Sequence, residues 1–413
     1  MTGGARSLIV NLLPMEALKT QKNQEKPASS ARIAPRLGII GGGQLARMTA
    51  VAALRLGCDV IVLERNDHSP AAQVATRCLV GDWNNPEALL KLASQVDVVS
   101  IENEFISTDA LAVIEKAGHR LFPSTETLRL IQDKLTQKQC LQRAGLATTR
   151  FVAVENQQRL AEVTREFGLP LVLKARRNGY DGKGNYTIKT EADIPDAWKA
   201  LNGDRNELYA EAFCNYHAEL AVIITRGQDG AMAVYPVVET VQRDHICHIV
   251  RAPAAVSPNA HEKAHQMARA AIEAIEGVGS FGIELFVSEN DEVMINELAP
   301  RVHNSGHYTI EGCVCSQFEN HVRALFGWPL GSTAMVNPAA VMVNLLGASQ
   351  GSGAPLGIEN ALQVGGAHIH IYGKAMSGRG RKMGHVTAIG PDVARAEAAA
   401  QSAAGKIFFG STT

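Results

Sequence analysis

Residues 37–48 read LGIIGGGQLARM and predict how the fold begins. An apolar run leads into three successive glycines, and an apolar helical pattern follows them directly. Gly41, Gly43 and Ala46 match the dinucleotide-binding pattern G-x-G-x-x-G/A, and the next apolar run ends on an acid, Glu64, in the ribose-binding position. The stretch therefore predicts a strand, a phosphate-accommodating turn and a helix, and read alone it indicates a nicotinamide or flavin enzyme.

The composition is that of a globular protein. The 413 residues are 46% hydrophobic and 20% charged, with a formal net charge of −1, and this length predicts two or three domains. No basic excess points to nucleic acid as a partner, and no apolar run approaches the roughly 20 residues that span a membrane. The seven scattered cysteines form no C-x-x-C pair, which favours buried reduced thiols over disulfides or a zinc site.

Four regions differ in pattern. Residues 1–35 are polar with mixed charges; we expect a flexible leader, with an organelle transit peptide as the alternative. Residues 36–133 alternate apolar strands with helical stretches, which predicts a Rossmann-like parallel sheet with ligands at its strand ends. Residues 134–330 read as a mixed α+β domain, and residues 331–413 as a small β-rich C-terminal domain.

A glycine-rich turn lies between two strand-like runs. Residues 179–185 read GYDGKGN, and backbone amides freed by glycine can approach a triphosphate closely, although a plain hairpin turn is the alternative. Lys174 stands near the end of the preceding apolar run, where a buried ammonium needs an anionic partner. Lys134 opens an earlier helix and is either a second phosphate contact or a surface charge.

Two glutamates indicate a metal site. Glu284 in FGIELF and Glu297 in MINELAP end two apolar strand-like runs. With Asn296 they offer hard oxygen ligands of the kind that Mg²⁺ takes beside nucleotide phosphates. A single strand glutamate would more simply be an edge residue in water, but two at matching positions favour a metal.

Two polar loops complete the candidate site. The stretch PRVHNSGH crowds Arg301, His303, Asn304 and His307 beside the expected metal, where Arg suits an oxyanion and His can donate to one or pass a proton. The later stretch YGKAMSGRGRKMGH is basic and glycine-rich, which fits either a solvated loop or a phosphomonoester pocket. Its basic residues are Lys374, Arg379, Arg381 and Lys382.

These motifs resemble one family of the ATP-grasp superfamily. GGGQLARM, DKLTQKQ, GYDGKGN, INELAPRVHNSGH and GRKMGH stand in the order found in 5-(carboxyamino)imidazole ribonucleotide synthetases, over about residues 36–390. The resemblance implies that ATP, bicarbonate and 5-aminoimidazole ribonucleotide give the carboxyamino product, ADP and phosphate in de novo purine biosynthesis. It also implies ATP and Mg²⁺ (or Mn²⁺) as cofactors and a homodimer.

The resemblance assigns roles residue by residue. The implied ATP-binding residues are Lys134, Lys174, Gly179, Tyr180, Asp181, Gly182, Lys183, Gly184, Asn185, Glu211, Ala212, Phe213, Cys214, Glu219, Gln242, Asn296 and Glu297. The implied metal ligands are Glu284 and Glu297. The implied catalytic residues are Arg301, His303 and Lys374 at carboxyphosphate, with Tyr180, Asp181 and Lys183 at the aminoimidazole. The implied ribonucleotide-binding residues are Gln44, Leu45, Glu102 and Asn304, with Lys374, Arg381 and Lys382 at the phosphate.

The residue chemistry fits this reaction. Bicarbonate is a poor electrophile and must first take the γ-phosphoryl group, a transfer that depends on positioning and charge neutralisation. Because carboxyphosphate hydrolyses readily, we expect the glycine-rich loop to exclude water, and Asp181 to position the amine or accept its proton. Gln242 departs from the family pattern, since bacterial members often have a histidine there; Gln can hydrogen-bond but carries no charge.

Three alternatives compete with this reading. Formate-dependent glycinamide ribonucleotide formyltransferase, a sister enzyme, shares the glutamates and the basic loop but typically lacks the Tyr-Asp pair. A nicotinamide dehydrogenase leaves the downstream motifs without a role, and a catalytically inactive nucleotide sensor is the third. Eukaryotic relatives often continue into a mutase domain; this chain ends at Thr413, so we expect the mutase on another chain, or this sequence to be a fragment. The expected location is the cytoplasm, or a plastid or other organelle with a transit peptide.

Overall fold

The computed structural model describes residues 34–179 and 184–410. Almost all of the predicted leader, residues 1–35, therefore lies outside the described residues, as do Tyr180, Asp181, Gly182 and Lys183 of the predicted ATP loop. Within the described ranges, no helix is both long and apolar enough to cross a bilayer.

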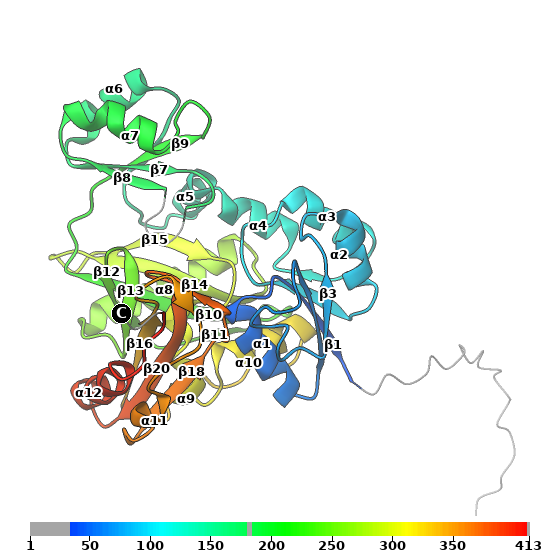
Figure 1. Ribbon diagram of the computed structural model, residues 1–413. Helices are drawn as coiled ribbons and strands as arrows, with labels where there is room; N and C mark the ends of the chain where they lie inside the picture. The colour runs from blue at the N-terminus through cyan, green and yellow to red at the C-terminus, as the bar shows by residue number, and fades with distance from the viewer. Residues whose placement is uncertain (1–33, 180–183, 411–413) are drawn as a thin grey trace, which may run out of the picture. The chain divides into compact units, whose positions relative to one another are not determined.

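The N-terminal region contains the predicted parallel sheet (Figure 1, blue to cyan). Its strand order is β3-β2-β1-β4-β5, and every neighbouring pair is parallel. The strands are β1 (Arg36–Ile40), β2 (Asp59–Glu64), β3 (Arg77–Val80), β4 (Val98–Ile101) and β5 (Leu121–Phe122). The chain reverses its direction of progress across the sheet between β1 and β4, and ligands of such sheets bind in the crevice at that point.

Helices cover both faces of this sheet. Leu37, Ile39 and Val60 pack on one face, with α1, and Ile40, Ile61 and Leu63 pack on the other, with α2 and α3. The helices are α1 (Gln44–Arg55), α2 (Pro86–Ala93), α3 (Thr108–Lys116), α4 (Thr125–Gln132) and, from a distant part of the chain, α10 (Gln317–Phe326). Buried Val322 and Leu325 of α10 join the α1 face, so a late helix completes the first layer.

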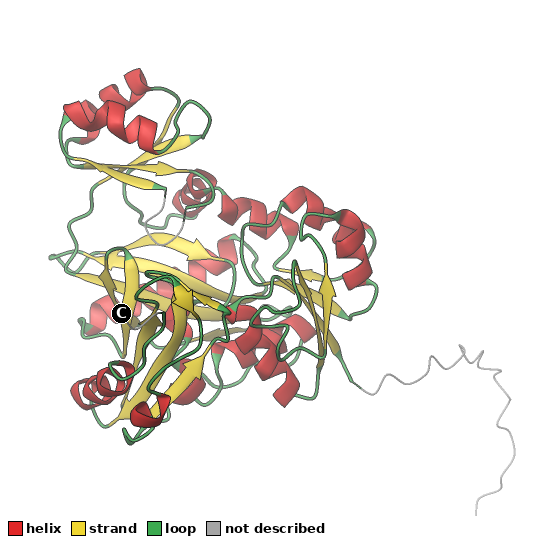
Figure 2. Ribbon diagram, viewed as in Figure 1, coloured by secondary structure: helices red, strands yellow, loops and turns green. Residues whose placement is uncertain are grey.

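A small antiparallel sheet follows (Figure 2, top). Its strand order is β6-β9-β7-β8, and a core that includes Leu160, Trp198 and Leu173 lies between it and its helices. Its elements are β6 (Phe151–Val154), α6 (Gln157–Phe167), β7 (Leu171–Ala175), β8 (Asn185–Ile188), η1 (Glu191–Asp193), α7 (Ile194–Ala200) and β9 (Leu208–Ala212), and α5 (Lys134–Arg143) precedes them.

The largest sheet runs through the central and C-terminal regions without a break. Its path is β15-β14-β10-β12-β13-β16-β20-β18, with β11 beside β10. Its strands are β10 (Ala218–Arg226), β11 (Met232–Val234), β12 (Val238–Arg243), β13 (Ile246–Ala252), β14 (Gly279–Val287), β15 (Val293–Ala299), β16 (Ala339–Leu346), β18 (Ala367–Ile371) and β20 (Lys382–Gly390). Because β13 pairs with β16, the β-rich C-terminal region continues the sheet that carries the two predicted metal ligands.

Shorter elements surround this sheet. They are α8 (Pro258–Ala274), η2 (Asn304–Gly306), α9 (Thr309–Gly312), β17 (Gly351–Ser352), α11 (Ile358–Ala361), β19 (Met376–Ser377) and α12 (Val393–Ala404). Alanines of α8 pack closely on the β10–β14 side of the sheet, and alanines of α12 pack on β16 and β20. The predicted class, a Rossmann-like sheet followed by mixed α+β and β-rich parts, is confirmed.

Candidate active site

A cavity of about 450 Å³ lies between the small sheet and the largest sheet, and we call it the inter-sheet cavity. The predicted site residues that line it are Lys134, Lys174, Gly179, Asn185, Glu211, Ala212, Phe213, Cys214, Glu219, Gln242, Glu284, Asn296, Glu297, His303, Asn304 and Lys382. The fold thus brings residues of the central and C-terminal regions together around a single space.

Lys174 belongs to a buried charge network on the small sheet. Its Nζ lies 3.1 Å from Glu211 Oε2, and Lys138 Nζ, whose side chain is only 2% exposed, lies 3.3 Å from Glu211 Oε1. Burial opposes the charge of Glu211, but the two lysines outweigh it and lower the pKa of the carboxyl to about 2. The anionic partner that buried Lys174 requires is therefore in the chain itself. Lys138, which sequence reasoning missed, lies in the quoted DKLTQKQ stretch.

Lys134 is part of the cavity wall rather than a solvated surface charge. Its side chain is 16% exposed, and Nζ lies 3.0 Å from Glu297 Oε2. Burial alone would lower the pKa of the Lys134 ammonium, but the negative charges of Glu297 and Glu104 outweigh burial and raise it. Asp133 caps the helix that Lys134 opens by accepting hydrogen bonds from the backbone of Leu135 and Thr136.

The two predicted metal ligands face each other across neighbouring strands. Glu284 of β14 and Glu297 of β15 are direct partners in the antiparallel register. Burial, followed by the charges of Glu297 and Glu219, raises the pKa of Glu284 to about 8. Asn296 donates from Nδ2 to Glu284 Oε2 at 3.3 Å, while its buried Oδ1 has no hydrogen-bond partner among the described residues.

This donor set fits a hard cation. Repelling carboxylates and an unpaired amide oxygen are the ligands that Mg²⁺ accepts when phosphates and water supply the rest of its shell. The residues that the structure describes hold no group of three or more His, Cys, Asp or Glu side chains suited to a metal. A metal here would therefore depend on a bound phosphate for part of its coordination.

The loop after β15 places Arg301 and His303 beside these carboxylates. His303 Nε2 lies 3.5 Å from Glu284 Oε1, and burial, then Arg301, lowers the pKa of this imidazole well below its usual value. Gln317, which sequence reasoning missed, holds the loop by accepting from His303 N at 2.9 Å and donating to its carbonyl at 2.7 Å. At Gly282 of β14 an added Cβ would stand 2.6 Å from His303 Cβ, so the loop needs this glycine.

A second cavity of about 480 Å³ lies at the reversal point of the parallel sheet, and we call it the switch-point pocket. Its predicted lining residues are Gln44, Glu102, Lys374 and Arg381. Arg65 and Trp83 were not predicted; Arg65 stacks over the Trp83 ring with 4.5 Å between guanidinium carbon and ring centroid. Both come from loops after strands of the parallel sheet, a position that could have singled them out.

Some predicted ribonucleotide residues lie elsewhere. Leu45 is buried in an apolar cluster with Val302 and Phe318. Asn304 and Lys382 line the inter-sheet cavity, and Asn304 exchanges two amide hydrogen bonds with Asn344 at 2.7 and 3.0 Å. Asn344 gave no sequence signal, because it stands in a strand forty residues later. His307 is buried behind the site, 5.0 Å from His385 between ring centroids.

Two carboxylates occupy the glycine turn where a dinucleotide would sit. Glu64 Oε2 accepts a 2.6 Å hydrogen bond from Gly42 N, and a Cβ at Gly43 would stand 2.2 Å from Glu102 Oε1. Burial, opposed by nearby Asn103 and Arg301, raises the pKa of Glu102. A pyrophosphate needs the same amides and the same space, so the nicotinamide or flavin interpretation of the glycine pattern is wrong.

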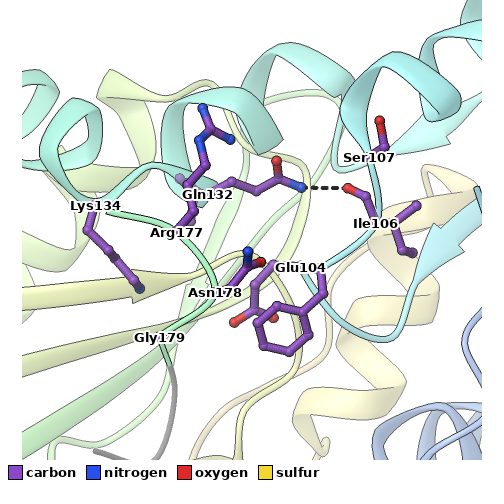
Figure 3. A pocket seen from close by; sticks show the side chains of 10 residues that line it. Glu104, Ile106, Ser107, Gln132, Lys134, Arg177, Asn178 and Gly179 are labelled. Atoms are coloured by element: carbon purple, nitrogen blue, oxygen red, sulfur yellow. Dashed lines mark hydrogen bonds between the residues drawn. The ribbon is translucent and has the colours of Figure 1, made fainter. Parts of the chain in front are cut away.

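A smaller pocket of about 180 Å³ lies where the loop after β4 approaches Arg177, Asn178 and Gly179, and we call it the neck pocket (Figure 3). Glu104, Lys134, Arg177 and Gly179 line it. Gln132 closes one side by donating from Nε2 to the Ile106 carbonyl at 2.8 Å (Figure 3, dashed line). The neck pocket shares Lys134 and Gly179 with the inter-sheet cavity, so the two spaces adjoin.

Three family descriptions match successive parts of the chain. Residues 35–132 match the ribonucleotide synthetase preATP-grasp domain, residues 139–318 the ATP-grasp domain, and residues 340–399 the phosphoribosylaminoimidazole carboxylase C-terminal domain. Together they cover the parallel sheet, the region of the inter-sheet cavity and the C-terminal strands.

Curated relatives and solved structures agree with these matches. A phosphoribosylaminoimidazole carboxylase of Ogataea methanolica is 42% identical over 86% of this chain, which spans 66% of that relative's length. An N5-carboxyaminoimidazole ribonucleotide synthase of Synechococcus elongatus is 42% identical over 85% of this chain and 88% of its own. The structure of an Aspergillus clavatus N5-carboxyaminoimidazole synthase, in complex with ADP and 5-aminoimidazole ribonucleotide, is 37% identical, with a TM-score of 0.82 over 90% of this chain and 98% of that one.

Proposed function

This chain belongs to the N5-carboxyaminoimidazole ribonucleotide synthase family of ATP-grasp enzymes, and from that premise we propose that it carboxylates 5-aminoimidazole ribonucleotide. ATP and bicarbonate are the co-substrates, and ADP, phosphate and N5-carboxyaminoimidazole ribonucleotide are the products. The observation that carries the proposal is the placement of Arg301, which follows the strand of Glu297 and pairs with Glu104, two residues after Glu102 of the switch-point pocket. One cation thus joins the loop after β4, beside the switch-point pocket, to the loop after β15, beside the inter-sheet cavity, and the two half-reactions would meet there.

ATP is assigned to the inter-sheet cavity. Lys174 and Lys134 are the cations that would contact its phosphates, and each is at present held by a carboxylate. Phe213 and Tyr216 line the same cavity and offer aromatic surface for the base. Lys382, which also lines this cavity, is proposed to act on the nucleotide side rather than at the ribonucleotide phosphate.

Mg²⁺, or chemically similar Mn²⁺, is assigned to Glu284 and Glu297, with Asn296 beside them. The unpaired Asn296 Oδ1 and the mutual repulsion of the carboxylates support this assignment. When bound, the cation would neutralise charge on the phosphate oxygens during phosphoryl transfer.

The protein's own groups account for the first step. A bicarbonate oxygen attacks the γ-phosphorus, the bond to ADP breaks, and carboxyphosphate forms. Arg301 supplies positive charge to the anionic intermediate, and neutral His303 supplies a hydrogen-bond donor. Burial and Arg301 lower the pKa of His303, which favours an imidazole that acts as a hydrogen-bond donor over one that adds a second cation beside the metal site.

In the second step the ribonucleotide's exocyclic amine attacks the carboxyl carbon, and phosphate leaves. The amine is assigned to the switch-point pocket, with Gln44 and Glu102 at the ribose and Lys374 and Arg381 at its phosphate. Asp181, with Tyr180 and Lys183, remains our proposal for orienting the aminoimidazole and accepting its proton.

Partners and location extend the same proposal. We infer a homodimer whose product passes to a mutase on another chain. The chain spans 64–66% of the length of the first carboxylases that it matches, so a mutase in the same protein is the competing arrangement. We infer a cytoplasmic location, or a plastid if residues 1–35 act as a transit peptide.

Measured ADP release tests the function directly. With ATP and Mg²⁺, we expect aminoimidazole ribonucleotide plus bicarbonate to stimulate ADP release, and glycinamide ribonucleotide plus formate to leave it at the basal rate. Relatives named for the carboxylating reaction support this order. Stimulation by the formate pair alone would replace the proposal with the formyltransferase, and stimulation by neither pair would reject both.

A further inference from the structure

Arg301 is held by a residue that the sequence did not single out. Its Nε lies 2.5 Å from Glu104 Oε2 and its Nη2 lies 2.9 Å from Glu104 Oε1. The two side chains are 17% and 16% exposed. This two-point pairing joins the loop after β4 of the parallel sheet to the loop after β15 of the largest sheet, although the residues stand 197 positions apart.

The pairing leaves one edge of the guanidinium available. Glu104 uses Nε and Nη2, and among the residues that the structure describes the remaining nitrogen, Nη1, has only a 3.4 Å contact with the Val302 carbonyl. A planar guanidinium fixed at two points has a fixed direction for its third nitrogen. Glu104 therefore sets where Arg301 can donate.

Other carboxylates compete for Arg301. Glu102 and Glu297 both act electrostatically on the guanidinium, and neither forms an ion pair with it in the described residues. An arginine without Glu104 would be free to turn toward either one, and each has a proposed role of its own. A fixed partner thus keeps Arg301 from neutralising the ribonucleotide pocket or the metal site.

We propose that Glu104 is a positioning residue for Arg301, holding its guanidinium between the inter-sheet cavity and the switch-point pocket so that it meets carboxyphosphate. This inference rests on the proposed function. It adds that the parallel sheet contributes to the phosphoryl-transfer step through the β4 loop, not only to ribonucleotide binding.

A double-mutant cycle tests the inference. We expect Glu104→Gln to lower kcat by about 10–100-fold, the range for a small misplacement of a catalytic group, with ATP affinity changed less than about threefold. Glu104→Asp, which keeps the charge, should recover part of the rate. In the Arg301→Gln background, Glu104→Gln should add no further loss, because residues that act as a unit are not additive.

The matched control is Glu319→Gln, which breaks another arginine pair, Arg323 Nη2 to Glu319 Oε1 at 2.5 Å, on α10. It should leave kcat unchanged. Normal kcat in Glu104→Gln, an equal loss of ATP affinity, or fully additive losses in the double variant would each overturn the inference.

A second readout does not depend on turnover. Phenylglyoxal should modify Arg301 faster in Glu104→Gln than in the wild type, as measured by mass spectrometry of the peptide, because the paired guanidinium is shielded. Equal rates would overturn the positioning role. The two proposals can fail separately. If Glu104→Gln is modified faster than the wild type but aminoimidazole ribonucleotide does not stimulate ADP release by the wild type, the proposed function is rejected and the Glu104–Arg301 coupling stays supported.

Discussion

The two glutamates of the switch-point pocket, and two of the four that line the inter-sheet cavity, meet different partners. Glu64 and Glu102 lie against the glycine turn, where Glu64 accepts the Gly42 amide hydrogen bond. Glu284 and Glu297 face each other across two strands, and Glu284 has a strongly raised pKa. The same residue type therefore supports the backbone at the end of β2 in one cavity, and forms a like-charged pair within β14 and β15, beside Lys134, in the other.

What separates Glu64 from Glu284 is the partner of each carboxylate. An acid that accepts from a fixed amide gains in the folded state, whereas an acid beside another acid is stabilised only when positive charge arrives. A carboxylate that binds a cation is thus recognised by the lack of a backbone hydrogen-bond donor and by a neighbouring like charge. The following predictions test this contrast in order of decreasing expected effect, and the matched control Glu64→Gln stands directly after the change that it controls.

Glu284→Gln should give the largest effect. Removing a metal-binding carboxylate should lower kcat by about 1,000-fold, comparable with the loss of a strong transition-state contact. The same change removes like-charge repulsion, so the ligand-free protein should gain free energy of unfolding. Steady-state ADP release and thermal melts measure the two outcomes, which should move in opposite directions.

Glu64→Gln is the matched change in the other pocket. Glu64 accepts from Gly42 N and from Arg65 N, each at 2.6 Å, and a glutamine oxygen can keep one of these hydrogen bonds, so kcat should stay within about fivefold of wild type. If Glu64→Gln were as damaging as Glu284→Gln, the distinction between a supporting and a ligating carboxylate would fail.

Gly43→Ala should give an intermediate effect confined to the ribonucleotide. The backbone φ of −75° suits alanine, but the new Cβ would displace the Glu102 carboxylate. We expect KM for aminoimidazole ribonucleotide to rise by about 10–100-fold without a change in ATP affinity. Gly365→Ala, where an added Cβ meets nothing within 4 Å, is the control and should leave both constants unchanged.

The pH dependence of ligand-free stability should show the smallest effect. Burial beside Glu297 raises the pKa of Glu284 to about 8, so the folded protein keeps a proton that the unfolded chain has already released. The stabilisation is fully present below the ordinary pKa of 4.5 and is lost as pH rises through about 8. Denaturant melts between pH 5 and 8 should show a decline on the order of 1 kcal/mol that Glu284→Gln abolishes.

Local patterns were enough to predict much of the fold. Alternating apolar and helical stretches predicted the parallel sheet and placed the GGGQL turn at a strand end, because such signals depend on neighbours in sequence. The strand order that makes this end the reversal point is known only from the structure. The downstream motifs already argued against a nicotinamide or flavin cofactor at that turn. The structure adds the physical reason, because Glu64 and Glu102 fold back onto the glycines.

The residues that sequence reasoning missed act through distant partners. Glu104 reaches Arg301, Lys138 reaches Glu211, and Gln317 holds the His303 backbone. None stands in a conspicuous spacing, since each is defined by a contact that only the folded chain creates. The split of Lys374 and Lys382 between two cavities is likewise invisible in a run of basic residues.

The helix α10 has a consequence for how the protein is made. Val322 and Leu325 of α10 complete the apolar layer on one face of the first sheet, and His321 Nε2 lies 3.1 Å from Ser100 Oγ of β4. The last strand of that sheet ends at Phe122, so at ordinary synthesis rates about 10–40 s separate it from the arrival of Phe326. During that interval the nascent sheet exposes part of an apolar face to solvent, which is the kind of surface that chaperones bind on the ribosome.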